Sequence, residues 1–413
     1  MKRFFTRYIF IFLAFGYFHS LGAFQIEFSM PDSADVIATA RQFIQQKQFA
    51  TAHALLDSAI TLYGPIPGLV CLEIENVLEH HFTHKDFKTF YLRNYPQHWE
   101  ESQTAQIQNS AIRFLRYPDR ILKKLLEKNP KAACAYRLLG DYYNLILNNK
   151  LETYALSRKE IADLEKQIVE NYSNAVELGL QDKEIYLWLG DYYQQQNNFK
   201  RAKWYYQKTL DVNPNDPIAN FRLAQIYYQE KQYSQAVARA SSALDNFSDD
   251  DIYLRYDALI LLAQSYRELG EMDDFVDAIV EAIQFLPDQQ RAYLLLIDYY
   301  DAKGQLQEAE QLFRQMLVHN PYDRPGFERL EKFVVEHNDF LFSENLFNDL
   351  IVRFENNDEV QGNLYWFRGN ILWQQGLTEE AQQMWQLAKK YLKKCYPPNH
   401  PLLKEIGRPP GTG

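Results

Sequence analysis

The stretch that decides the fold is residues 189–193, which read Leu-Gly-Asp-Tyr-Tyr. The same five residues occur at 139–143, and Leu-Ile-Asp-Tyr-Tyr occurs at 296–300. A motif that recurs within one chain indicates internal repeats, and a repeated unit constrains the fold class more strongly than overall composition does.

One position of the repeat is occupied in turn by Gly190, Ala224, Ala263, Ile297 and Gly369. Gly190 and Ala224 lie 34 residues apart, as do Ala263 and Ile297. Apolar residues three and four positions apart predict amphipathic helices within each unit. A fixed period of this size predicts a solenoid, in which each unit packs mainly on its neighbours.

The pattern resembles the tetratricopeptide repeat, whose units carry a large aromatic residue and then Leu, Gly, Tyr, Ala, Phe, Ala and Pro at set offsets. The best match in this chain consists of Tyr186, Leu189, Gly190, Tyr193, Ala202, Tyr206, Thr209 and Pro214. Units beginning at Tyr293 and Tyr365 also match, and the unit at 324–357 matches more weakly. The resemblance covers residues 33–64 and 133–394. It implies an all-α, right-handed superhelical solenoid of antiparallel helix pairs.

The small residues of this pattern have a packing role. Gly190 and Ala202 are expected to let two helices approach, while Leu189, Tyr193 and Tyr206 fill the space between them. We therefore predict that these positions stabilise the fold and do not bind a ligand.

The chain divides into four predicted segments. Residues 1–23 form a signal peptide, and residues 24–132 form partly degenerate N-terminal helical repeats. Residues 133–394 form the main array, with an insertion near 148–168. Residues 395–413 form a Pro-rich tail that we expect to be extended or disordered, because successive prolines cannot continue a helix.

Two regions within these segments depart from the repeat pattern. Residues 69–130 are predicted to be helical but irregular, with Phe87, Phe90 and Tyr91 on one helix. The insertion near 148–168 keeps an approximate helical period, so we expect it to extend the second helix of its pair beyond the neighbouring units. The alternative is a flexible surface insertion.

The N-terminal segment has the layout of a secretory signal. Basic residues before position 8 precede an apolar run at 8–18, and small residues follow it. We expect cleavage after Gly22 or Ala23; the alternative is an uncleaved anchor. No stable membrane span is expected after cleavage, and the apolar run is short against the roughly 20 residues that a helical span needs. The protein is then exported, and is periplasmic, envelope-associated or secreted.

Charge and cysteine content narrow the class of protein further. The formal net charge is -10, and the Lys and Arg residues are scattered, which argues against nucleic-acid binding. Cys71, Cys134 and Cys395 lie far apart in sequence, so we expect three small apolar packing residues, although one bridge stays open.

No pattern of catalytic residues is present. His80 and His84 have the spacing of two metal ligands on one helical face, with Glu79 beside them, but no second cluster supports a metal site. The sequence has no Gly-rich phosphate loop and no nucleophile elbow. We therefore predict a protein that is not an enzyme and has no catalytic residue, cofactor or metal.

The resemblance implies a concave groove, lined by the first helix of each unit, that holds a partner peptide. The residues in lining positions are Arg137, Asp141, Asn144, Leu187, Asp191, Gln194, Phe221, Gln225, Tyr228, Gln264, Arg267, Asp298, Asp301, Trp366, Asn370 and Trp373. This mixture of polar and aromatic residues suits hydrogen bonds combined with rigid apolar contact. The family's clamp for a terminal carboxylate uses Lys, Arg and Asn, and acidic residues prevail here, so that specificity is not expected. The alternative is that many of these residues are ordinary solvated surface.

The sequence thus predicts a non-catalytic scaffold that binds a protein or peptide partner through the groove, outside the cytoplasm. The alternative from another class is an accessory protein that binds or exports an envelope polysaccharide or cell-wall polymer, suggested by the export signal together with Tyr and Trp residues.

Overall fold

The computed structural model describes most of the chain. The described residues are 32–83, 87–92, 112–152, 156–322 and 324–408. The chain divides into two compact units, residues 1–181 and residues 182–413, and each is described by itself. The predicted signal peptide lies outside the described residues. Among the described helices, none has the length and apolar character that crossing a membrane requires.

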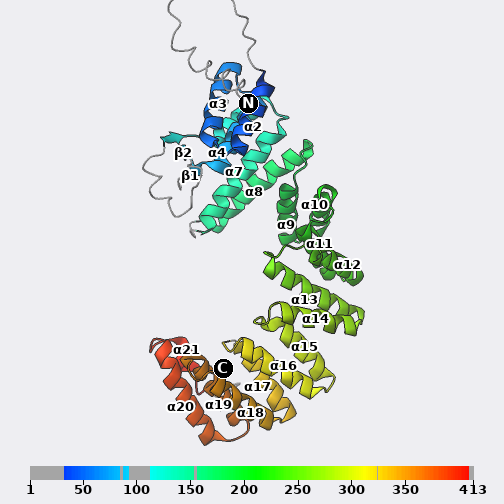
Figure 1. The fold of residues 1–413 in the computed structure, drawn as a ribbon, viewed down its shortest axis with the longest axis vertical. Coiled ribbons are helices and arrows are strands. Elements are labelled where there is room, and N and C mark those ends of the chain that lie inside the picture. The colour runs from blue at the N-terminus through cyan, green and yellow to red at the C-terminus, as the bar shows by residue number, and fades with distance from the viewer. Residues whose placement is uncertain (1–31, 84–86, 93–111, 153–155, 323, 409–413) are drawn as a thin grey trace, which may run out of the picture. The chain divides into compact units, whose positions relative to one another are not determined.

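Unit 1 combines helices with a small sheet (Figure 1). Its elements are α2 (Ser33–Gln45), α3 (Phe49–Tyr63), α4 (Pro67–His80), β1 (Phe82–Thr83), β2 (Thr89–Leu92), β3 (Ile112–Leu115), α6 (Pro118–Lys128), α7 (Ala133–Glu152) and α8 (Arg158–Glu177). The three strands pair in the order β1-β2-β3, and both pairings are antiparallel.

The sheet corrects the prediction that residues 69–130 are helical throughout. Phe90 and Tyr91, which were predicted to lie on a helix, belong to β2, and Phe87 lies just before it in the left-handed region with φ 53°. Phe90 is fully buried, and its ring centroid lies 6.0 Å from that of Phe114 on β3. Aromatic and β-branched residues favour a pleated, half-buried surface. A segment this short shows too little period to separate strand from helix.

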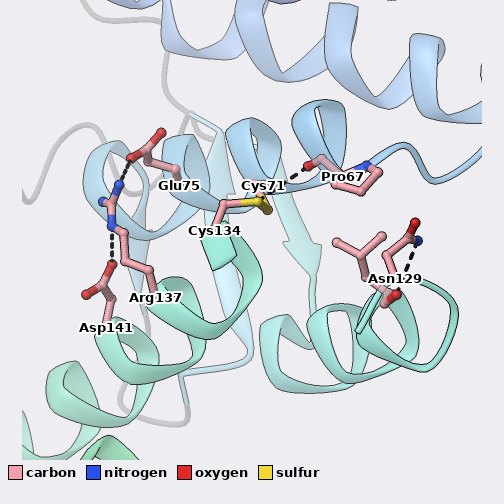
Figure 2. Close-up of a disulfide and its surroundings, with 8 residues drawn as sticks. Pro67, Cys71, Glu75, Asn129, Cys134, Arg137 and Asp141 are labelled. Atoms are coloured by element: carbon pink, nitrogen blue, oxygen red, sulfur yellow. Dashed lines mark hydrogen bonds and ion pairs between the residues drawn. A yellow bond between two sulfur atoms is a disulfide. The ribbon is translucent and has the colours of Figure 1, made fainter. Parts of the chain in front are cut away.

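A disulfide between Cys71 on α4 and Cys134 on α7 corrects the prediction for the cysteines (Figure 2). The two Cα atoms lie 6.1 Å apart, which is an ordinary separation for a bridge. Cys395 is a free thiol at the exposed end of α20, so the prediction of a packing residue is wrong there as well. Residues 63 positions apart in sequence give no local sign that the fold brings them together.

The insertion near 148–168 lengthens both helices of its pair. Helices α7 and α8 each have 20 residues. A capping box begins α8: the Ser157 backbone N–H donates to Glu160 Oε2 (2.8 Å), and the Glu160 N–H donates to Ser157 Oγ (3.3 Å). Such a box satisfies backbone donors that a helix start leaves unpaired. The predicted single long second helix is therefore wrong, although helix does extend into the insertion.

Unit 2 consists of successive antiparallel helix pairs and a short closing helix (Figure 1). Its first helices are α9 (Lys183–Gln195), α11 (Pro217–Gln229), α13 (Ile252–Leu269), α15 (Gln290–Ala302), α17 (Arg324–His337) and α19 (Asp358–Gln374). Its second helices are α10 (Phe199–Val212), α12 (Tyr233–Leu244), α14 (Met272–Phe285), α16 (Leu306–His319), α18 (Phe340–Arg353) and α20 (Thr378–Cys395). The closing helix is α21 (Pro401–Glu405). This arrangement confirms the predicted all-α solenoid.

The joints between paired helices explain the repeated small residues. A Cβ added to Gly190 on α9 would lie 2.4 Å from the Tyr206 ring on α10, and one added to Gly369 on α19 would lie 2.6 Å from the Trp385 ring on α20. Tyr206 is fully buried. Because protein interiors are close-packed, an added Cβ would have no space beside the ring. Each glycine therefore allows a large ring of the partner helix to pack against it, as predicted for Gly190.

The C-terminal segment is not the extended tail that we predicted from its prolines. Pro401 starts α21, where its missing N–H costs nothing. Leu402, Leu403 and Ile406 are buried in one cluster with Trp385. They cover the open apolar face of the last pair, which a terminal repeat needs. Residues 409–413 lie outside the described part.

Candidate binding surface on the first helices

The predicted groove residues of unit 2 all lie on its first helices. Those on α9 and α11 are Leu187, Asp191, Gln194, Phe221, Gln225 and Tyr228. Those on α13, α15 and α19 are Gln264, Arg267, Asp298, Asp301, Trp366, Asn370 and Trp373. We call the solvent-facing side of these helices the first-helix surface.

A polar network joins α9 to α11 on this surface. Arg222 Nε donates to Asp191 Oδ1 (3.0 Å), and Arg222 Nη1 donates to Gln225 Oε1 (3.2 Å). Gln194 Nε2 donates to Gln225 Oε1 (3.4 Å). The Tyr206 hydroxyl lies 2.7 Å from both Asp191 Oδ1 and Gln194 Oε1 and can donate to either. The structure thus brings Asp191, Gln194 and Gln225 together.

A second network joins α15 to α17. Arg329 Nε donates to Asp298 Oδ1 (2.9 Å), and Arg329 Nη2 donates to Asp301 Oδ2 (2.7 Å). His337 Nε2 lies 2.6 Å from Asp301 Oδ1. Partial burial alone would raise the pKa of Asp301, but the hydrogen bonds from Arg329 and His337 outweigh it and lower that pKa.

The two networks repeat one geometry. Arg222 follows Asp191 by 31 residues, and Arg329 follows Asp298 by 31 residues. Sequence reasoning missed both arginines. Each lies two residues before the residue that corresponds to Gly190 in its own repeat, and this shared position was the available signal. Ion pairs with such exposure contribute about 0–1 kcal/mol each. Their effect is to hold successive first helices in a fixed relation.

Several predicted lining residues are not on the surface. Leu187 is 8% exposed and Phe221 is 2% exposed, and both belong to core clusters. Their side chains are therefore unavailable to a partner. Tyr228 packs edge-on against Tyr233, and Trp373 tilts against Trp385 at a ring distance of 5.6 Å. Gln264 and Arg267 on α13 are half-buried.

The remaining predicted residues lie on α7 of unit 1. Arg137 Nη1 lies 2.7 Å from Glu75 Oε1, and its Nε donates to Asp141 Oδ2 (3.1 Å), as Figure 2 shows beside the disulfide. Asp141 Oδ1 also accepts a hydrogen bond from Tyr172 (2.9 Å), and Asn144 Oδ1 accepts one from an α7 neighbour. Arg137 and Asp141 thus link α7 to α4 and α8.

Helices α17, α19 and α21 line a cleft of about 620 Å³. Its lining residues are Arg324, Glu328, Glu331, Lys332, Val335, Glu336, Trp366, Phe367, Asn370, Gln374 and Glu405. Trp366 and Asn370 belong to the predicted set. The volume falls within the range of about 300–1,000 Å³ that is typical of ligand pockets.

The wall of this cleft is fixed by a chain of hydrogen bonds. Trp385 Nε1 donates to Asn370 Oδ1 (3.0 Å), and Asn370 Nδ2 donates to Glu331 Oε2 (3.1 Å). Burial raises the pKa of Glu331, although the hydrogen bonds from Asn370 and Gln374 oppose the rise. The result is a carboxylate that is partly desolvated and held in one orientation.

The His and Glu residues with metal-ligand spacing lie only partly within the described residues. His80 Nε2 lies 3.4 Å from Glu79 Oε2, and His84 lies outside the described part. Within the described ranges, no group of three or more His, Cys, Asp or Glu side chains has an arrangement that could hold a metal ion.

Comparison with known protein families agrees with the repeat pattern. Residues 187–251 and 231–288 match the family described as tetratricopeptide repeat. Over these residues the chain is similar to the tetratricopeptide repeat. The matched residues run from within α9 to just beyond the end of α14, and they include the contact between Gly190 and Tyr206.

The similar proteins include one human relative and several solved structures. Human protein IFIT1 homolog B is 25% identical over 131 residues, which cover 30% of this chain and 27% of that protein. The C-terminal part of a repeat protein from Cytophaga hutchinsonii has a TM-score of 0.44 and 13% identity, covering 71% of this chain and 98% of that one. YrrB, described as a TPR protein with an unusual peptide-binding site, has a TM-score of 0.32 and 15% identity, covering 57% and 97%.

Proposed function

We propose that this chain is a non-catalytic scaffold that binds a protein or peptide partner on the first-helix surface of unit 2, and that it does so outside the cytoplasm. The observation that carries the proposal is the cleft between α17, α19 and α21, which opens on that surface and combines aromatic, amide and charged side chains. A few placed polar groups beside apolar walls are typical of binding sites.

The networks between first helices support a binding role because they make the surface rigid. The Arg222–Asp191 and Arg329–Asp298 pairs each tie one first helix to the next. A surface that is ordered before binding loses less conformational entropy when a partner arrives. Stacked repeats use extended surfaces of this kind to hold partners.

Two independent features support export. Residues 1–23 have the basic, apolar and small-residue order of a secretory signal. Cys71 and Cys134 form a disulfide, and disulfides persist mainly in oxidising compartments. N-terminal sequencing of the protein from its native cells tests cleavage, and a chain that still begins at Met1 argues against it. If Cys71 is reduced in the same protein, that result argues against an oxidising compartment.

Site-specific photocrosslinking tests the binding role. Val335 lines the cleft and is 39% exposed, so p-benzoylphenylalanine at this position should crosslink a partner in native cells. Leu341 on the second helix α18 is 69% exposed, and the same probe placed there serves as the control.

The expected result is one discrete crosslinked product from position 335 that is absent or weak from position 341. Mass spectrometry of that product then identifies the partner. If equal labelling occurs at both positions, or if position 335 gives no product while the variant is folded by circular dichroism, the proposed binding surface is incorrect.

A further inference from the structure

The cleft between α17, α19 and α21 is acidic. Its lining contains four glutamates, one arginine and one lysine. The lysine, Lys332, lies 3.6 Å from Glu336 on the same helix. The arginine, Arg324, lies over the Trp366 ring at 5.3 Å from its centroid. Both cations of the cleft are therefore already engaged.

Three carboxylates remain without a basic partner. Among the described residues, no Lys or Arg nitrogen lies within salt-bridge distance of Glu328, Glu331 or Glu405, whereas Asp191 and Asp298 elsewhere on the first-helix surface each have an arginine. The cleft thus leaves negative charge unpaired at the end of a surface whose other characterised acids are paired.

The position of Glu331 in the repeat is an independent sign of function. It follows Ile297 by 34 residues, so it occupies the position that holds Gly190, Ala224 and Ala263 in other units. A charged residue at a packing position breaks the rule that the rest of the array follows, and such departures are expected mainly at functional or strained sites.

The structure shows how this departure is tolerated. Glu331 accepts a hydrogen bond from Asn370, which is 8% exposed and is itself held by Trp385. The carboxylate is partly buried, and among the described residues no Lys or Arg nitrogen lies within salt-bridge distance of it, which is unfavourable for the free protein. An incoming cation would relieve that cost, and a charge-assisted hydrogen bond is stronger in a partly desolvated setting.

We propose that the cleft binds a peptide segment of the partner through an Arg or Lys side chain, which pairs with Glu331 and Glu328, while a neighbouring apolar residue lies against the exposed Val335. This inference rests on the proposed function, because it names the ligand chemistry of the same surface. Arg324 lies over the Trp366 ring, and Trp366 is 8% exposed, so this ring forms part of the cleft wall.

Selection from a displayed library of random peptides tests the inference on the full chain. The selected peptides should share an Arg or Lys beside an apolar residue. Their affinity, measured by fluorescence polarisation, should fall about tenfold or more with Glu331→Gln, since one charge-assisted hydrogen bond is lost. Gln keeps an acceptor for Asn370, so the fold should be preserved. Glu328→Gln should also weaken binding.

Glu344 provides the matched control. It is an exposed glutamate on the second helix α18 of the same repeat, and Glu344→Gln should leave affinity unchanged. Replacing the peptide's Arg by citrulline should cause a loss at least as large as Glu331→Gln, and Glu331→Gln should add little further loss for the citrulline peptide. Peptides selected without a shared cation, a failure to select any peptide, or equal losses at Glu331 and Glu344 would each overturn the inference.

The two proposals fail in different ways. A partner that crosslinks from position 335 but shows no dependence on a cation refutes the ligand chemistry alone. If no partner crosslinks at that position, the binding surface itself is refuted.

Discussion

Replacing Gly190 by Ala tests the joint on which the repeat depends. The new Cβ would lie 2.4 Å from Tyr206 Cε1 and 2.7 Å from its Cδ1, which is closer than real contacts allow. Tyr206 is fully buried, and its hydroxyl is bonded to Asp191 or Gln194. The ring therefore cannot move away without losing a hydrogen bond or displacing core neighbours.

Two opposing effects set the magnitude. Ala is favoured over Gly in a helix interior by about 1 kcal/mol. Overpacking a close-packed site costs about 1–3 kcal/mol. The variant Gly190→Ala should therefore be less stable by about 0–2 kcal/mol. In a Tyr206→Ala background the clash is absent, so the same substitution should stabilise unit 2 by up to about 1 kcal/mol.

The experiment is a double-mutant cycle of four proteins. Their unfolding in urea is followed by circular dichroism, and hydrogen exchange in α9 and α10 gives a local reading that does not require two-state behaviour of the whole chain. The expected coupling energy between positions 190 and 206 is about 1–3 kcal/mol. If Gly190→Ala has the same effect in both backgrounds, contact with Tyr206 is not the reason for glycine.

Three further predictions concern other parts of the molecule. Replacing Cys71 and Cys134 by Ser should destabilise unit 1 by about 2–4 kcal/mol, because the bridge closes a long loop; unchanged hydrogen exchange in α4 and α7 would contradict this. Burial lowers the pKa of His81 to about 4, so as pH falls from 6.5 to 4 only the unfolded chain gains a proton, and unit 1 should lose on the order of 2 kcal/mol. His81→Asn should flatten this slope in urea titrations, and an unchanged slope would assign it to another group. Burial raises the pKa of Glu331 above its ordinary 4.5 in the folded protein, so the free energy of unfolding falls as pH rises from 4.5 through the raised pKa. Glu331→Gln should then raise the Tm at pH 7, and a lower Tm would show that the carboxylate is a net stabiliser.

The helical array was predictable because packing between neighbouring helices determines the repeated sequence pattern. Gly190 and Tyr206 are 16 residues apart, and so are Gly369 and Trp385, which make the same contact between the paired helices α19 and α20. Short-range geometry of this kind appears as a period in the sequence. The same reasoning placed the predicted lining residues of unit 2 on its first helices, although the side chains of Leu187 and Phe221 belong to the core.

Features that depend on distant contacts were not predictable in the same way. The strand at Thr89–Leu92 is determined by pairing with Ile112–Leu115, and its four residues carry no distinctive period. The Cys71–Cys134 bridge depends on how α4 and α7 pack. Helix α21 forms because its apolar residues cover the last pair, so the prolines around it were misleading as a sign of disorder.

Within the candidate site, the register predicts position but not charge pairing. Asp191 and Asp298 resemble ligand-binding acids when their helices are considered alone, yet each accepts a hydrogen bond from an arginine of the following repeat. Glu331 was not among the predicted lining residues because its position holds a packing residue in the other units. That same reason makes it informative: a charged group at a packing position costs stability unless something pairs with it. The acids that match the expected surface pattern therefore hold the array together, and the one that violates the packing pattern is the better candidate for contact with a partner.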